Sequence, residues 1–255
     1  MPEKERMRLD KALARMGIGT RSELKRMARE GRITVNGEVV RDSGTAVWPE
    51  RDVIEVDGER VRYREHVYIM LNKPRGVVSA TEDRRERTVL DLIAPELKAF
   101  RPFPAGRLDK DVEGLLLITS DGELAHGLLS PRRHVPKTYR AEVDGPAPVG
   151  EEDIRLFQRG VELDDGYVTM PAELKVLHAE AADNGFRSSV ELTICEGKYH
   201  QVKRMFEAVG KKVVRLKRIR MGPLALDPAL PAGGYRELSD EETALLKEIA
   251  KGGKS

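Results

Sequence analysis

The densest group of side chains that could carry chemistry lies between two glycines. It contains three carboxylates and two basic side chains, and an apolar run follows it at once. A carboxylate held at the edge of a buried strand is partly desolvated and aimed, so it can act as a nucleophile or a base. The alternative interpretation is a surface hairpin whose acids are solvated. The segment is Gly106-Arg107-Leu108-Asp109-Lys110-Asp111-Val112-Glu113-Gly114.

The sequence offers little support for other chemistries. Asp109 and Asp111 would share one face of a strand, whereas retaining glycosidases need carboxyl groups about 5–5.5 Å apart that flank the sugar. No histidine pair has metal-binding spacing, and neither a phosphate-binding glycine loop nor a Gly-x-Ser-x-Gly motif occurs. One cysteine, Cys195, excludes a disulfide scaffold and a cysteine-only metal site. We therefore expect no metal and no cofactor.

The composition is that of a globular protein. The chain has 255 residues, enough for one or two domains, and 40% of them are hydrophobic. Charged residues make up 35%, and no stretch approaches the roughly 18 apolar residues of a membrane span. The opening residues contain no apolar stretch, so we expect no signal peptide and a cytoplasmic location.

Positive charge is concentrated in two regions although the net charge is only +2. Residues 1–32 contain ten Lys and Arg against five Asp and Glu, and residues 196–220 contain nine against two. Such clusters favour a polyanionic partner, while solvated basic helix faces are the alternative. Lys211 and Lys212 follow a helix stop at Gly210, so we expect both to face solvent or phosphate.

Two domains are predicted from the spacing of apolar and turn residues. Residues 7–62 should form a small α+β unit with two helices and an Asn36-Gly37 hairpin. Residues 63–66 should be a linker, and 67–245 a larger α+β domain in which strands and helices lack a regular alternation, which favours a mixed or antiparallel sheet. Residues 246–255 are predicted to be a disordered tail.

Three N-terminal segments then carry a resemblance to a known domain. They are Arg8-Leu9-Asp10-Lys11-Ala12-Leu13, Thr20-Arg21-Ser22-Glu23-Leu24 and Gly31-Arg32-Ile33-Thr34-Val35-Asn36-Gly37. Together they resemble an αL-type S4 RNA-binding domain, which implies docking to structured RNA through the helix pair. The side chains implied to contact phosphates are Arg8, Lys11, Arg21, Lys25, Arg26 and Arg29.

Four further segments occur in order between residues 67 and 220. They are Leu71-Asn72-Lys73-Pro74-x-Gly76, the Gly106–Gly114 segment with its following strand, Lys137-Thr138-Tyr139, and Glu196-Gly197-Lys198-Tyr199-His200-Gln201-Val202-Lys203-Arg204. This set is similar to the motifs of the pseudouridine synthases that modify ribosomal RNA. The resemblance implies a catalytic domain built on a mixed, mostly antiparallel sheet.

The same resemblance assigns catalytic roles to Asp109, Tyr139 and Lys203. Asp109 would open the glycosidic bond of a uridine, either by attacking C1′ or by taking the C2′ proton, and both routes stay open. Lys203 would stabilise the Asp109 carboxylate, and Tyr139 would stack on the uracil and could move the C5 proton. The residues implied to bind the substrate are Arg107, Leu216, Lys73, Arg132, Arg133, Lys137, His200, Gln201 and Arg204.

Some of these residues have more specific expected roles. Arg107 would fill the gap that the extruded base leaves in the RNA, and Leu216 would pack beside the reacting base. Arg132, Arg133, Lys137 and Arg140 would form a basic rim for the RNA backbone.

Two features resemble the small-subunit (RsuA-type) branch of the family. They are the Tyr199-His200-Gln201 form of the last motif and the run from 130 to 134. The resemblance implies that the partner is 16S ribosomal RNA or a pre-ribosomal small-subunit particle, and it involves no membrane. A large-subunit target and a non-catalytic RNA-binding assembly factor are the alternatives. We expect the protein to be a monomer.

Overall fold

The chain divides into two compact units. The computed structural model describes residues 6–183 and 185–252. The first unit comprises the chain up to Val67 together with Ile93–Pro102, and the second comprises Tyr68–Leu92 and the chain from Phe103 onward. The segment containing helix α3 (Pro95–Lys98) therefore belongs to the first unit. The sequence predicted one continuous second domain over residues 67–245, whereas residues 93–102 within that range belong to the first unit.

The first unit is built as the local sequence predicts. Thr20 caps α2 in a capping box, since its hydroxyl accepts from the Glu23 amide at 3.3 Å and the Glu23 carboxylate accepts from the Thr20 amide at 2.7 Å. Asn36 and Gly37 both have positive φ, as a tight hairpin turn requires. Strands β3, β2, β5 and β6 form one sheet in that order, and β1 pairs with β4. The elements are β1 (Met7–Arg8), α1 (Leu9–Arg15), α2 (Arg21–Arg29), β2 (Ile33–Val35), β3 (Glu38–Val39), β4 (Ala46–Val47), β5 (Ile54–Val56) and β6 (Glu59–Val61).

A mixed sheet forms the centre of the second unit, which confirms the predicted fold class. Its strands run in the order β11-β12-β10-β13-β9-β7-β15, with β14 beside β13 and β8 beside β9. Only the β13–β9 pair is parallel among the pairs of this sheet that the described residues form. The strands are β7 (Tyr68–Lys73), β8 (Phe103–Pro104), β9 (Glu113–Thr119), β10 (Lys137–Gly145), β11 (Glu173–Ala182), β12 (Gly185–Ile194), β13 (Lys212–Met221), β14 (Leu224–Ala225) and β15 (Tyr235–Glu237).

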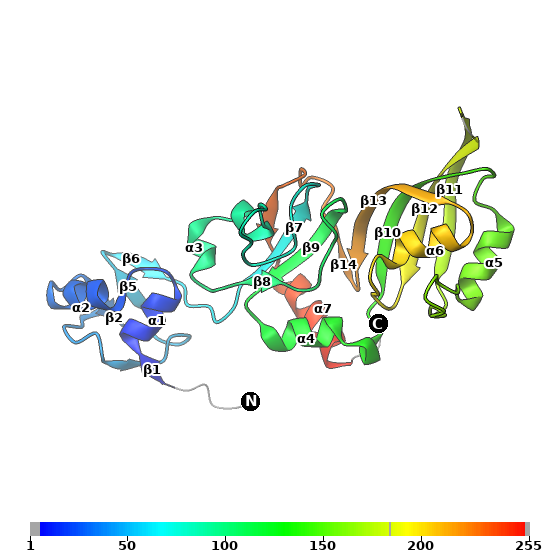
Figure 1. Ribbon diagram of the computed structural model, residues 1–255. Coiled ribbons are helices and arrows are strands. Elements are labelled where there is room, and N and C mark those ends of the chain that lie inside the picture. The colour runs from blue at the N-terminus through cyan, green and yellow to red at the C-terminus, as the bar shows by residue number, and fades with distance from the viewer. Residues whose placement is uncertain (1–5, 184, 253–255) are drawn as a thin grey trace. The chain divides into compact units, whose positions relative to one another are not determined.

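Helices flank this sheet in separate groups. Helix α4 packs against α7, α6 packs against β13, and α5 packs against β11 (Figure 1). Within the described residues, no helix has the length and apolar character needed to cross a bilayer. The helical segments are η1 (Val89–Leu92), α4 (Gly122–Leu129), η2 (Pro131–Arg133), α5 (Glu151–Arg159), α6 (Gln201–Ala208) and α7 (Asp240–Lys251).

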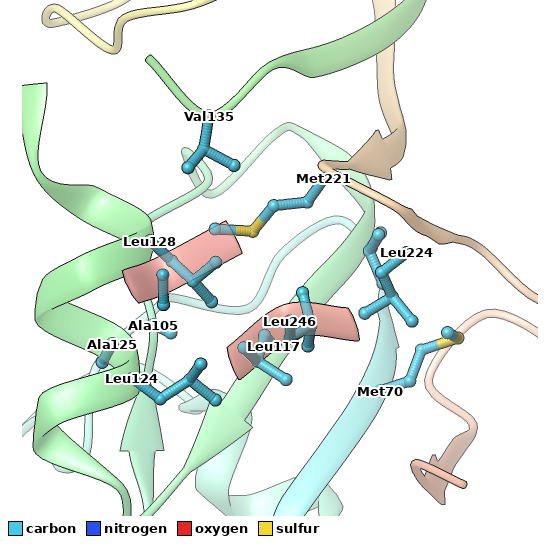
Figure 2. Packing of buried hydrophobic residues seen from close by; sticks show 12 residues of the cluster. Met70, Ala105, Leu117, Leu124, Ala125, Leu128, Val135, Met221, Leu224 and Leu246 are labelled. Carbon is cyan, nitrogen blue, oxygen red and sulfur yellow. The ribbon is translucent and has the colours of Figure 1, made fainter. Parts of the chain in front are cut away.

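Helix α7 corrects the predicted disordered tail. Leu246 is fully buried, and it joins Leu124 and Leu128 of α4 and Leu117 of β9 in one apolar cluster (Figure 2). The prediction of disorder over 246–255 is therefore wrong for residues 246–251, because this turn of helix covers the core. Residues 253–255 of that prediction lie outside the described residues.

Gly114 permits the one parallel junction of the sheet. It has φ +105, pairs with Arg218 of β13, and a Cβ there would collide with the Arg218 carbonyl oxygen. Only glycine tolerates both this backbone conformation and so close an approach. The start of β9 is thereby held against β13, directly after the carboxylate-rich segment.

Candidate active site

Asp109 lies in the turn that leads into β9. The turn is closed by a hydrogen bond from the Val112 amide to the Asp109 carbonyl oxygen at 3.1 Å. The Asp109 side chain is 34% exposed, so its carboxylate is accessible to a ligand while part of it is shielded. Leu108, just before it, is buried and is held by Ser79, whose hydroxyl donates to its carbonyl oxygen at 2.8 Å and accepts from its amide at 3.1 Å.

A buried lysine fixes the backbone of this turn. The Lys73 ammonium, at the end of β7, donates to the carbonyl oxygens of Val112 at 2.8 Å and Asp109 at 2.9 Å, with longer contacts to Pro74 and Lys110. Burial lowers the pKa of Lys73 to about 8, against the opposing effect of the nearby carboxylates. Lys73 therefore positions the turn from inside, and the prediction that it binds substrate directly is wrong because its ammonium is fully enclosed.

Lys203 of α6 bridges two carboxylates. Its ammonium lies 2.8 and 2.9 Å from the two oxygens of Asp111 and 3.4 Å from Oδ2 of Asp109. Burial opposes ionisation of Asp111, but the hydrogen bond and charge of Lys203 outweigh it and lower the pKa of that carboxyl. Lys203 contacts Asp109, as the resemblance implied. Its shorter hydrogen bonds go to Asp111, so one ammonium is shared by two carboxylates.

His200 reaches the same carboxylate from the start of α6. Its Nε2 lies 3.5 Å from Oδ2 of Asp109, and its backbone is left-handed with φ +48. The predicted site residue His200 is therefore beside the predicted catalytic carboxylate. It also stacks on Tyr199, with ring centroids 3.8 Å apart.

Sheet register aligns Tyr139 with the start of β9. Tyr139 of β10 pairs with Arg218 of β13, and Arg218 pairs with Gly114 of β9. Tyr139 is buried, and Leu216 is two residues from Arg218, so it points to the same face of β13. The helix that carries Lys203 packs against β13. Asp109, Lys203, Tyr139 and Leu216 thus belong to adjoining elements of one unit.

The arginines of η2 line a separate basic pocket of about 550 Å³. Arg132 and Arg133 share it with His126 of α4 and Lys251 of α7. Leu129, at the end of α4, lies so close to Gly106 that a Cβ on that glycine would be 2.9 Å from the leucine side chain. Gly106 begins the chain segment that leads through the exposed Arg107 to Asp109, and none of these residues lines the pocket.

Three other predicted substrate contacts have internal partners. The Lys137 ammonium is buried and donates to the Val135 carbonyl oxygen at 2.9 Å, so its predicted place on an exposed basic rim is wrong. Burial lowers the pKa of Lys137, and the charge of Arg218 adds to this effect. Gln201 is buried with its amide bonded to Glu196 at 2.6 Å, which makes it a structural residue. The Arg204 guanidinium is paired with Asp164 and Asp165.

The basic residues predicted on the N-terminal helices are exposed. Arg8 forms an ion pair with Asp10 at 2.7 Å, and Arg26 forms a longer one with Glu30 at 3.7 Å. Arg8 lies on β1, while the other five lie on α1 and α2. All six are exposed and could meet phosphates; they are Arg8, Lys11, Arg21, Lys25, Arg26 and Arg29.

Sequence reasoning did not identify the positioning residues of the turn. Asp111 is the closest partner of Lys203, Ser79 holds Leu108, and Arg75 donates to the Asp111 carbonyl oxygen at 3.1 Å. Ser79 lies outside the recognised motifs, so only the fold could bring it to Leu108. Arg75 and Asp111 lie within the motifs, each two positions from a predicted site residue, Lys73 and Asp109. That closeness in sequence could have marked them as candidates.

Two family models match the chain. The RNA pseudouridylate synthase model matches residues 67–208, and the S4 domain model matches residues 7–53. An uncharacterised RNA pseudouridine synthase of Bacillus subtilis, YtzG, is 52% identical over 95% of this chain and 99% of its own length.

Relatives named for both ribosomal subunits are equally similar. The ribosomal large subunit pseudouridine synthase B of Bacillus subtilis is 41% identical over 97% of this chain and 98% of its own. The ribosomal small subunit pseudouridine synthase A of Escherichia coli is 41% identical over 93% and 99%. A crystal structure of a pseudouridylate synthase matches with a TM-score of 0.63 and 38% identity over 94% of this chain and 99% of that one.

Proposed function

The chain belongs to the RNA pseudouridylate synthase family, and on that premise we propose that it converts one uridine of ribosomal RNA to pseudouridine. The observation that carries the proposal is the placement of Asp109. Its carboxylate is accessible, is held by a rigid turn, and lies 3.4 Å from the Lys203 ammonium. A non-catalytic RNA-binding protein needs a basic surface, but RNA binding does not require an accessible carboxylate fixed beside an ammonium group.

Asp109 is the group that acts on the ribose. The reaction breaks the N1–C1′ bond of the uridine, turns the uracil, and forms a bond from C5 to C1′. Asp109 either attacks C1′ or removes the C2′ proton, and both roles need an ionised carboxylate. The ammonium of Lys203 stabilises that negative charge in a site where water is only partly present.

Tyr139 and Leu216 form the binding site for the uracil. Both are buried side chains on neighbouring strands, β10 and β13, on the face next to the start of β9. An aromatic ring there can stack on the base while it turns, and its hydroxyl can take part in removing the C5 proton. The uridine must leave its helix to reach this place, and exposed Arg107 is positioned to enter the gap.

Small-subunit RNA is the first target that we propose, and large-subunit RNA is the alternative. The support for the small subunit is the Tyr199-His200-Gln201 form of the last motif together with the run from 130 to 134. The exposed basic side chains of α1 and α2 would hold the RNA by its phosphates.

The proposal is tested by mapping pseudouridines in total ribosomal RNA from cells with and without the gene. We expect one uridine to lose its modification in the deletion strain, in 16S RNA, and to regain it when the wild-type gene is restored. Restoration with Asp109→Asn should leave the position unmodified. Loss of a pseudouridine from 23S RNA instead would show that the target lies in the large subunit. An unchanged map of both RNAs would contradict the proposed function.

A further inference from the structure

Tyr199 is exposed to an unusual degree for an aromatic side chain. It is 75% exposed, more than any other exposed large hydrophobic residue among those described, the next being Val168 at 57%. An exposed aromatic ring offers a flat apolar face on which a ligand ring can stack. Its neighbour His200 covers one face of the ring, and the two planes are only 20° from parallel.

The segment that carries this ring is held firmly. The buried carboxylate of Glu196 accepts from the Tyr167 hydroxyl at 2.7 Å, the Met170 amide at 2.9 Å and the Gln201 amide at 2.6 Å. Gln201 in turn accepts from the Lys198 amide at 2.9 Å. The turn before α6 is thus fixed on both sides, and the aromatic pair is presented by a rigid element.

The pair is also close to the reacting centre. His200 contacts the Asp109 carboxylate at 3.5 Å, and the Tyr199 ring is 3.8 Å from the His200 ring. That spacing is near the roughly 3.4 Å between neighbouring bases in a nucleic acid strand. The open face of Tyr199 is therefore one stacked ring away from the group that must reach C1′ of the target uridine.

We propose that the open face of Tyr199 is a stacking site for the nucleobase next to the target uridine. This inference rests on the proposed function, and it specifies the form of RNA that the site accepts. A base within a duplex is already stacked on both faces, whereas an unpaired base can stack on an aromatic side chain. The target uridine and its neighbour on that side are then both unpaired, as in a loop or an assembling particle. Stacking does not depend on base identity, so the site selects RNA shape more than sequence.

The left-handed backbone of His200 is consistent with this role. A histidine with positive φ is uncommon, and such conformations persist where the surrounding structure enforces them. Here it turns the His200 ring under Tyr199 and directs its Nε2 toward Asp109. His200 thereby contacts both the Tyr199 ring and the Asp109 carboxylate.

The test uses fluorescence of 2-aminopurine, which is quenched when the base stacks. The probes are RNA hexamers of cytidine with one uridine and a 2-aminopurine on its 5′ or its 3′ side. Each is titrated with the full-length protein and with Tyr199→Ala, Tyr199→Leu and Tyr199→Phe. Phe186→Ala, which removes another exposed aromatic residue from β12, is the matched control.

We expect saturable quenching of one of the two probes by the wild type, by Tyr199→Phe and by Phe186→Ala. Tyr199→Ala and Tyr199→Leu should abolish the quenching and weaken binding about 5- to 150-fold, the range expected for one base–aromatic stack. Equal quenching by Tyr199→Ala would overturn the proposal. So would the absence of quenching by the wild type, which would favour a protein partner for Tyr199. The readout needs no turnover, so it is independent of the mapping that tests the proposed function.

Discussion

Lys203 serves two carboxylates, and this changes how large its effect should be. The side chain of Lys203 is 19% exposed, that of Asp109 34% and that of Asp111 65%, so the cluster is in contact with water. A dry ion pair that loses one partner typically costs about 3–5 kcal/mol, but solvent screening reduces that figure in a partly exposed cluster. The ammonium lies between the two carboxylates and is held mainly by Asp111.

Replacing Lys203 with Met should therefore lower the single-turnover rate at saturating enzyme by about 10- to 100-fold, the size of one hydrogen bond to a charged group. Affinity for RNA should change much less, because the side chain faces Asp109 and Asp111. Lys212→Met, at an exposed position of β13, is the control and should leave the saturated rate unchanged. An unchanged rate with weakened binding in Lys203→Met would show that this lysine contacts phosphate instead.

Single residues show where prediction from sequence succeeds and fails. Asp109 and Lys203 could be predicted to meet because both lie in recognisable motifs. Lys211 was predicted to face solvent or phosphate, and that is wrong: its ammonium is paired with Asp153 at 2.9 Å and its side chain is 9% exposed. The sequence around Lys211 contains no sign of Asp153, which lies 58 positions earlier on another helix.

Lys73, at the end of strand β7, holds the turn that carries Asp109. Its titration should change the stability of the protein with pH. Lys73 has a pKa of about 8 in the folded protein and about 10.4 in an unfolded chain. Between these values the unfolded chain binds more protons, so this group adds stability as pH rises through the interval. Below pH 8 lysine is protonated in both states and the added stability is lost.

The free energy of unfolding of the wild type, relative to Lys73→Met, should thus rise by up to about 3 kcal/mol between pH 7.5 and 10.5. Urea denaturation of both proteins across this range measures the difference, and all other titrating groups cancel in the comparison. A difference that stays constant with pH would mean that the lysine is not buried in the manner described.

Elements were predictable where local signals were strong. The Thr20–Glu23 capping box and the Asn36-Gly37 turn placed α2 and the first hairpin. The same kind of signal was present for α7, where Ser239 and Glu242 form a capping box, yet the position at the end of the chain favoured disorder. Leu246 could be recognised as core only with α4 in place. The alignment of Tyr139, Arg218 and Gly114 on three neighbouring strands depends on the order of the strands in the sheet. That order cannot be predicted from local sequence patterns.

At the scale of the whole molecule, we propose that the two units divide RNA recognition and catalysis between them. The first unit carries exposed basic residues on α1 and α2, and the second carries the carboxylate site. Changing Lys11, Lys25 and Arg29 together to Gln should lower the salt dependence of RNA binding, with the slope of log K against log salt falling by about 2. The saturated rate should be retained. Replacing Arg155, Arg159 and Lys175, exposed residues of the second unit, provides a control of equal charge. Equal slopes for the two triple variants would remove the first unit from RNA recognition.

The catalytic role of Asp109 is tested most directly by the single-turnover rate of Asp109→Asn on ribosomal RNA from the deletion strain. The amide keeps the shape of the side chain but can neither attack C1′ nor take a proton. Asp111→Asn, two residues away and bonded to the same lysine, is the control. We expect Asp109→Asn to form no detectable pseudouridine while binding the RNA with unchanged affinity, and Asp111→Asn to retain measurable turnover. Conversion by Asp109→Asn at a tenth of the wild-type rate or more would contradict the assignment.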